Sequence, residues 1–143
     1  MTRKEYQDIY EVVGAAMEVY NNLGRGLAEP IYQEALHLEM KGRGMVAERE
    51  KELSLTYKGI TLEKKYKADF YYNGILIELK AVDEVCSDHR AQLFNYMRIS
   101  KHFRGILFNF GERMLHTERY LYLPEIDDFV LLSQDNYLDY ITK

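Results

Sequence analysis

Two acids and a lysine lie close together in the stretch "YKADFYYNGILIELK", residues 66–80. Asn73–Gly74 is a strong signal for a two-residue hairpin turn, so the numbers of facing partners sum to 147. This register sets Asp69 opposite Glu78, and it places Lys80 on the same face as Glu78 because strand side chains alternate. Directly opposed like charges cost a sheet about 0.2–1 kcal/mol per pair, so the facing acids need an explanation.

A divalent cation between the two carboxylates is one explanation. Hard oxygen ligands on adjacent strands, with Cβ atoms about 5 Å apart, suit Mg²⁺ or Mn²⁺. The metal removes the repulsion and activates a bound water, while an ammonium such as that of Lys80 holds the water or offsets charge on a phosphate. Asp69, Glu78 and Lys80 therefore match what metal-assisted phosphodiester hydrolysis needs. The alternative is a solvated face on which two diagonal pairs, Asp69 with Lys80 and Glu78 with Lys67, cancel the repulsion.

The same alternation gives the hairpin an apolar and a polar face. The apolar face is expected in the core and consists of Tyr66, Ala68, Phe70, Tyr72, Ile75, Ile77 and Leu79. The polar face carries the two acids together with Lys65, Lys67, Tyr71, Leu76 and Lys80.

The elements around this hairpin follow from the spacing of apolar residues. Helical spacing and stop signals predict helices over residues 4–24, 29–44 and 87–102, and a final helix within 125–141. Alternation and turn signals predict strands at about 46–57, 60–72 (with a break near Lys64), 75–82 and 104–111. The order α-α-β-β-β-α-β indicates an α/β fold with a mixed sheet flanked by helices.

Length and composition restrict the class of protein. A chain of 143 residues, 47% hydrophobic and 29% charged, is typical of one globular domain, here residues 1–143. No apolar run approaches the roughly 18 residues that span a bilayer, and the N-terminus lacks the apolar core of a signal peptide. We therefore expect a cytoplasmic protein without a membrane partner. The single cysteine, Cys86, excludes an intrachain disulfide and argues against a cysteine-based metal site.

The charge distribution leaves room for a nucleic-acid partner. The net charge of −4 argues against a bulk coat protein of nucleic acid. Residues 58–104, however, carry nine Lys or Arg against six acids. Two runs within this part, "EKKYK" at 63–67 and "RISKHFR" at 98–104, interleave bases with aromatic residues, which can track phosphates and stack on bases. Ordinary solvated faces are the alternative.

Two further motifs carry a resemblance to a known family. The stretch "GLAEPIY" has the pattern Gly26-x-x-Glu29-x-x-Tyr32, and "QLFNY" has Gln92-x-x-x-Tyr96. Together with the Asp…Glu-x-Lys hairpin, these motifs resemble the GxxExxY protein family of the PD-(D/E)XK nuclease superfamily. The resemblance covers roughly residues 5 to 120, and it implies a restriction-endonuclease-like core.

The resemblance also implies roles for individual residues. Asp69, Glu78 and the Leu79 carbonyl would ligate Mg²⁺ or Mn²⁺, and Lys80 would position or activate the attacking water. Glu29 would add a carboxylate or hold a metal-bound water. Without the resemblance, Glu29 is an acid favoured by the dipole at the start of a helix.

Gln92 and Tyr96 stand four residues apart, so both can face the site from one helix. The resemblance implies that they orient the lysine or contact a phosphate. The alternative is that Tyr96 packs in the core and Gln92 caps the end of a strand.

The expected function is therefore a metal-dependent nuclease that acts on nucleic acid, with DNA as the favoured substrate. A second copy of the chain or a protein partner could supply additional grip on that substrate. The alternative is a non-catalytic nucleic-acid-binding or regulatory module that uses the same fold.

Overall fold

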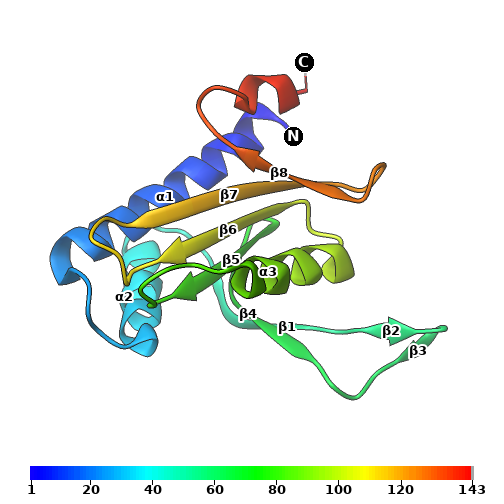
Figure 1. The fold of residues 1–143 in the computed structure, drawn as a ribbon, viewed down its shortest axis with the longest axis horizontal. Coiled ribbons are helices and arrows are strands. Elements are labelled where there is room, and N and C mark those ends of the chain that lie inside the picture. Colours follow the sequence, from blue (N-terminus) through cyan, green and yellow to red (C-terminus); the bar gives the residue numbers. More distant parts are fainter. Residues whose placement is uncertain (143) are drawn as a thin grey trace.

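The computed structural model describes residues 1–142 and contains a six-stranded sheet with order β1-β4-β5-β6-β7-β8 (Figure 1). The elements are α1 Arg3–Leu23, α2 Glu29–Gly42, β1 Glu48–Leu53, β2 Thr56–Tyr57, β3 Ile60–Thr61, β4 Tyr66–Tyr72, β5 Ile75–Lys80, α3 Ser87–Ser100, β6 Arg104–Asn109, β7 His116–Leu123, β8 Asp128–Leu132 and a short 3-10 helix Tyr137–Tyr140. Strands β5 and β6 run parallel, whereas the other neighbours in the sheet are antiparallel. The α/β fold with a mixed sheet flanked by helices is therefore confirmed.

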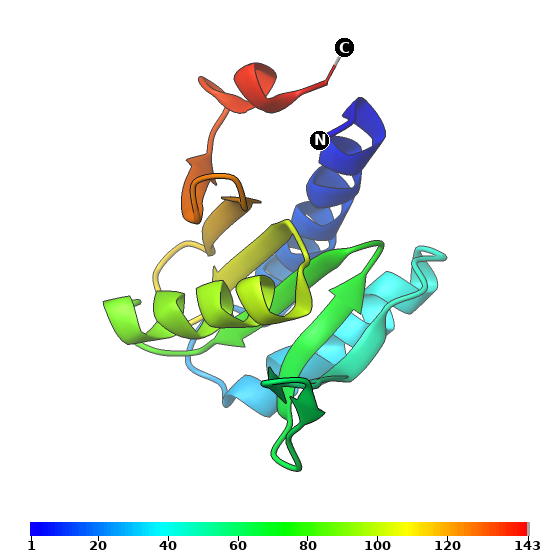
Figure 2. The same cartoon turned by 90° about the vertical axis from the view of Figure 1, so that its right-hand side faces the viewer.

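Helices cover both faces of the sheet (Figures 1 and 2). Residues of α1 and α2, among them Val12 and Leu36, form one core with the first face of the central strands. Leu93 and Met97 of α3 form a second core with the opposite face. Every residue of β5 from Ile75 to Leu79 is buried, as expected for a central strand that is covered on both sides.

The C-terminal part of the sheet differs from the sequence prediction. The helix predicted within residues 125–141 is wrong, because Asp128–Leu132 forms β8 and only Tyr137–Tyr140 is helical. Strand β7 was not anticipated. A short apolar run such as "DFVLL" does not distinguish helix from strand by periodicity alone, and here pairing with β7 decides the outcome.

The predicted strands before the hairpin are each divided. Residues 46–57 form β1 and β2, and residues 60–72 form β3 and β4, so the break expected near Lys64 is confirmed. Within residues 1–142, strands β2 and β3 pair only with each other.

The predicted hairpin register is confirmed next to its turn. Tyr72 pairs with Ile75, and the register continues to Phe70 with Ile77. Asn73 and Gly74 have φ angles of 48° and 86°, the left-handed conformations that a tight type I′ turn requires.

Strand β4 changes its orientation at Asp69, which corrects the predicted apolar face. Phe70 and Tyr72 belong to the core under α1 and α2, as predicted, but Ala68 belongs to the core under α3. The ring of Tyr66 also lies on the α3 side, 5.3 Å from that of Tyr96. Residues 68 and 70 of a regular strand share a face, so the strand is irregular between them.

Strand β1 is irregular at the facing position. Its pairs with β4 bracket Glu50, which has a φ of 55°. Irregularities of this kind often occur next to active sites, where they aim a side chain in a new direction.

In the described part of the chain, each helix is too short or too polar to cross a membrane.

Gly111 allows the chain that follows β6 to approach the chain that follows β5. A Cβ at Gly111 would overlap the backbone of Val82, whose N–H and carbonyl are bonded to the Asn109 side chain at 3.0 and 2.9 Å. We expect Gly111→Ala to lower the free energy of unfolding by about 2 kcal/mol, because the backbone must shift to make room. Urea denaturation measures the effect.

Gly42→Ala is the matched control, since a Cβ at Gly42 has open space around it. Alanine is the better helix former, so this variant should be unchanged or about 0.5–1 kcal/mol more stable. Equal stability of the two variants would contradict the close approach at Gly111.

Candidate active site

Asp69 and Glu78 each bind the backbone of the other's strand. The Asp69 N–H donates to Glu78 Oε1 at 3.2 Å, and the Leu79 N–H donates to Asp69 Oδ2 at 2.8 Å. These bonds stand where β4 is irregular and the regular register with β5 has stopped at Phe70. The two carboxylates therefore satisfy backbone groups that the sheet itself leaves unpaired.

Glu78 is buried and Asp69 is half-buried, and the two acids carry like charge. Glu78 is only 3% exposed, and burial, followed by the neighbouring Asp69 charge, raises its pKa well above the ordinary value. Burial also raises the pKa of Asp69, although the bond from the Leu79 amide works in the opposite direction. The solvated-face interpretation is therefore wrong. Within residues 1–142, the ion pairs include neither Glu78 with Lys67 nor Asp69 with Lys80.

A chain of hydrogen bonds connects Lys80 to α3. Lys80 Nζ donates to Gln92 Oε1 at 3.3 Å, and Gln92 Nε2 donates to the Tyr96 hydroxyl at 2.8 Å. Tyr96 also packs in the core under α3, and its pKa is raised by burial and by the charge of Glu78. Gln92 thus bonds the side chain of Lys80, the last residue of β5, and it holds the ammonium without neutralising it.

Glu29 lies beside this cluster at the start of α2. It is half-buried, and its pKa is raised first by burial and then by Asp69, whereas Lys80 lowers it. The preceding loop is fixed by Tyr32, whose hydroxyl donates to the Gly24 carbonyl at 2.6 Å and accepts from the Leu27 N–H at 3.2 Å. The tyrosine of the Gly26–Tyr32 motif therefore positions the loop that leads to its glutamate.

Gln33 is a site residue that the sequence analysis missed. Its Nε2 donates to Asp69 Oδ1 at 3.1 Å, and its Oε1 accepts from Arg49 Nε at 2.8 Å. Both oxygens of Asp69 are thereby held in place. The available signal was the four-residue spacing from Glu29, which places both side chains on one face of α2.

The donor set is compatible with a hard divalent cation. Glu29, Asp69 and Glu78 supply carboxylate oxygens, the ligand type that Mg²⁺ and Mn²⁺ prefer. No group of three or more His, Cys, Asp or Glu side chains within residues 1–142 is arranged so that it could hold a metal ion, so the three carboxylates do not form a common ligand set in this structure. A two-carboxylate site suits Mg²⁺ all the same, because this ion keeps several waters and is commonly bound by one or two carboxylates together with substrate phosphate.

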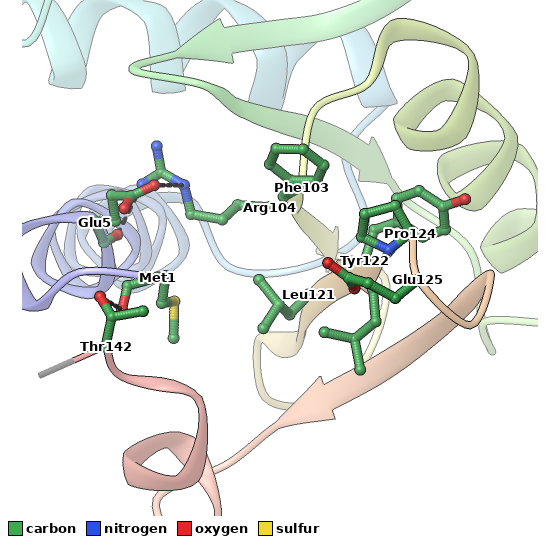
Figure 3. A pocket seen from close by; sticks show the side chains of 10 residues that line it. Met1, Glu5, Phe103, Arg104, Leu121, Tyr122, Pro124, Glu125 and Thr142 are labelled. Carbon is green, nitrogen blue, oxygen red and sulfur yellow. Dashed lines mark hydrogen bonds and ion pairs between the residues drawn. The ribbon is translucent and has the colours of Figure 1, made fainter.

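A separate hollow of about 400 Å³ lies at the opposite end of β5 and β6 (Figure 3). Its wall is largely apolar and includes Phe103, Leu121 and Pro124. The buried Arg104 at this hollow is engaged by Glu5, whose carbonyl accepts from its guanidinium at 2.8 Å. The hollow therefore forms no part of the carboxylate cluster.

The chain belongs to the PD-(D/E)XK nuclease superfamily, whose family model matches residues 6–120. The fold is similar to that in the crystal structure of SSO0001, with a TM-score of 0.50 and 24% sequence identity. That similarity covers 63% of this chain and 48% of the other, so the chain spans about half the length of this structural relative. No curated protein matches the chain.

The raised pKa of Glu78 predicts that removing its negative charge stabilises the metal-free protein. Since folding disfavours the charged form, the metal-free protein should lose stability as the pH rises from about 4.5 through the higher folded-state pKa. Glu78→Gln keeps an oxygen acceptor for the Asp69 N–H and should raise the free energy of unfolding at pH 7 by about 1 kcal/mol. Urea denaturation with a chelator should show this gain shrinking toward pH 4.

Glu118 provides the matched control, because its pKa is shifted in the opposite direction and its neutralisation should lower the free energy of unfolding. Burial alone would raise its pKa, but hydrogen bonds from Arg90, Tyr120 and His116 lower it to about 2. Glu118→Gln should therefore cost about 2 kcal/mol at pH 7, with the loss fading as the pH falls toward 2. If Glu78→Gln lowered the free energy of unfolding at pH 7 in the presence of a chelator, the interpretation that the Glu78 charge is unfavourable beside Asp69 would be contradicted.

Proposed function

We propose that this chain is a metal-dependent nuclease that hydrolyses phosphodiester bonds, with DNA as its substrate. The observation that carries the proposal is the meeting of Asp69, Glu78 and Lys80 at the irregularity of β4. The lysine is held there by an amide and not by a carboxylate, so its charge is available to a substrate. A catalytic site gives a reason for keeping a half-buried and a buried carboxylate side by side, which stability alone would select against.

Asp69 and Glu78 would hold Mg²⁺ or Mn²⁺, with the Leu79 carbonyl and Glu29 as further ligands. When bound, the metal would lower the pKa of a ligated water and polarise the phosphate. Gln33 and the Leu79 amide fix the Asp69 carboxylate, so its orientation is set before substrate arrives.

Lys80 would orient the attacking water and offset negative charge on the phosphate. Gln92 restricts the lysine through its carbonyl oxygen and is itself restricted by Tyr96. Gln92 and Tyr96 are therefore positioning residues in this proposal.

Within the superfamily, we propose membership of the GxxExxY family. The support is the local structure of the motif, in which Gly26 has a φ of 100° and Tyr32 ties down the loop before Glu29. A side chain at Gly26 would be strained in this conformation. The motif thus supplies a rigid approach to the third carboxylate.

Cleavage of single- and double-stranded DNA and RNA with Mg²⁺ or Mn²⁺ tests the activity. We expect wild type to cut DNA, and we expect Glu78→Gln and Lys80→Ala each to lose at least about 100-fold in rate. Lys41→Ala, an exposed change on α2, should cut like wild type. Equal cutting by all variants would indicate a contaminant, and tight binding without any cutting would support the non-catalytic alternative.

Metal binding can be tested separately from catalysis. A bound ion stabilises the folded state by mass action, by about 2.7 kcal/mol at 100 times its Kd. Mn²⁺ or Mg²⁺ should therefore raise the Tm of wild type, and the shift should be largely lost in Asp69→Asn and Glu78→Gln. The same shift in all three proteins would place any bound metal elsewhere.

A further inference from the structure

The β2–β3 hairpin extends away from the body of the protein (Figures 1 and 2). It pairs Thr56 with Thr61 and Tyr57 with Ile60, has a further backbone bond from the Leu62 N–H to the Leu55 carbonyl at 2.8 Å, and turns at Lys58–Gly59. Tyr57 is 61% exposed and Ile60 is 69% exposed. Isolated two-stranded hairpins are marginally stable, so this arm, residues 54–65, contributes little to the folded core and presents its side chains to solvent.

The arm and its base carry positive charge in an otherwise acidic chain. Residues 51–67 contain five lysines and two glutamates, against a net charge of −4 for the whole protein. Ion pairs occupy Lys51 and Lys65. In the described part of the chain, Lys58, Lys64 and Lys67 take part in no ion pair.

The arm leads directly into the carboxylate cluster. Residues 62–65 connect its second strand to β4, where Tyr66 stands three residues before Asp69. The ring of Tyr66 lies against Tyr96, which is bonded to Gln92 and through it to Lys80. A ligand that contacts both the arm and Tyr66 would therefore reach the site along β4.

We propose that the arm binds double-stranded DNA, with the two-stranded β2–β3 ribbon in the major groove and the lysines of the arm in contact with the phosphates. The major groove of B-form DNA is about 12 Å wide and admits a two-stranded ribbon, whereas the major groove of A-form RNA is too narrow for side chains to read. Phosphates supply the negative charge that complements Lys58 and Lys64. This inference rests on the proposed nuclease function and narrows its substrate to the DNA duplex.

Charge disfavours a second copy of the chain as the occupant. Two identical arms would bring lysine-rich surfaces together, and juxtaposed like charges oppose association. The exposed Tyr57 and Ile60 are flanked by Lys58, so an arm-to-arm contact would carry this repulsion.

Fluorescence anisotropy of a labelled DNA duplex, measured with a chelator so that no cutting occurs, tests the arm. The Lys58→Ala/Lys64→Ala double variant should bind the duplex about tenfold more weakly than wild type. The slope of log K against log salt concentration should be smaller in magnitude by about 2. The control Arg3→Ala/Lys41→Ala removes the same charge from exposed positions on α1 and α2 and should bind like wild type.

Unchanged duplex affinity in the arm variant, or absence of duplex binding by wild type, would overturn the proposal. If the arm variant lost as much or more affinity for single-stranded DNA or duplex RNA as for duplex DNA, the choice of duplex DNA as the ligand would be overturned. Analytical sedimentation would detect self-association of the chain. The proposal is overturned if the arm substitutions convert a dimer to a monomer and leave the affinity for DNA unchanged. Arm-dependent binding in the chelated sample, together with no cutting in the separate cleavage assay with Mg²⁺ or Mn²⁺, would support the arm and contradict the nuclease, so the two proposals fail separately.

Discussion

The crossed bonds between carboxylates and backbone amides at Asp69 and Glu78 are the constraint on which the site depends. Each acid accepts an N–H from the opposite strand, so the two strands stay together where their regular pairing stops. The exchange is possible only because β4 changes its orientation at Asp69. By the alternation of β5, Glu78 lies on the same face as Leu76, which packs with α3, while Asp69 reaches Gln33 on α2. One pair of neighbouring acids thus connects the helical layers on both faces of the sheet.

Helix α3 must be held firmly for this arrangement to work, because it carries Gln92 and covers Glu78. The guanidinium of Arg90 makes two bonds to the buried Glu118 on β7, at 2.8 and 2.7 Å. Arg90 is partly exposed, but loss of its bonds would leave the buried Glu118 charge uncompensated, so this contact helps to fix where α3 lies along the sheet. A favourable ion pair on β7 thus accompanies an unfavourable pair of like charges on β4 and β5, and α3 lies over both.

Sequence reasoning reached the hairpin because its information is local. The turn at Asn73–Gly74 sets a register that runs from Tyr72 with Ile75 to Phe70 with Ile77, and the next residues along the two strands are Asp69 and Glu78. The irregularity at Asp69 could not be predicted in the same way, since it depends on bonds that form only after the strands have met. Gln33 was missed because its partner lies 36 residues away, and β8 because its conformation depends on pairing with β7. The roles of Lys80 and the metal remain predictions from chemistry and family resemblance.

The hydroxyl of Tyr32 has a consequence for how the site is assembled during folding. It closes a loop of nine residues, from Gly24 to Tyr32, so the approach to Glu29 is encoded within one short segment. The facing acids are likewise separated by a single hairpin. Contacts between residues close in sequence carry a small entropic cost and form early, whereas distant contacts form late. The site therefore consists of two locally encoded halves, and the bond from Gln33 to Asp69 is the long-range step that joins them.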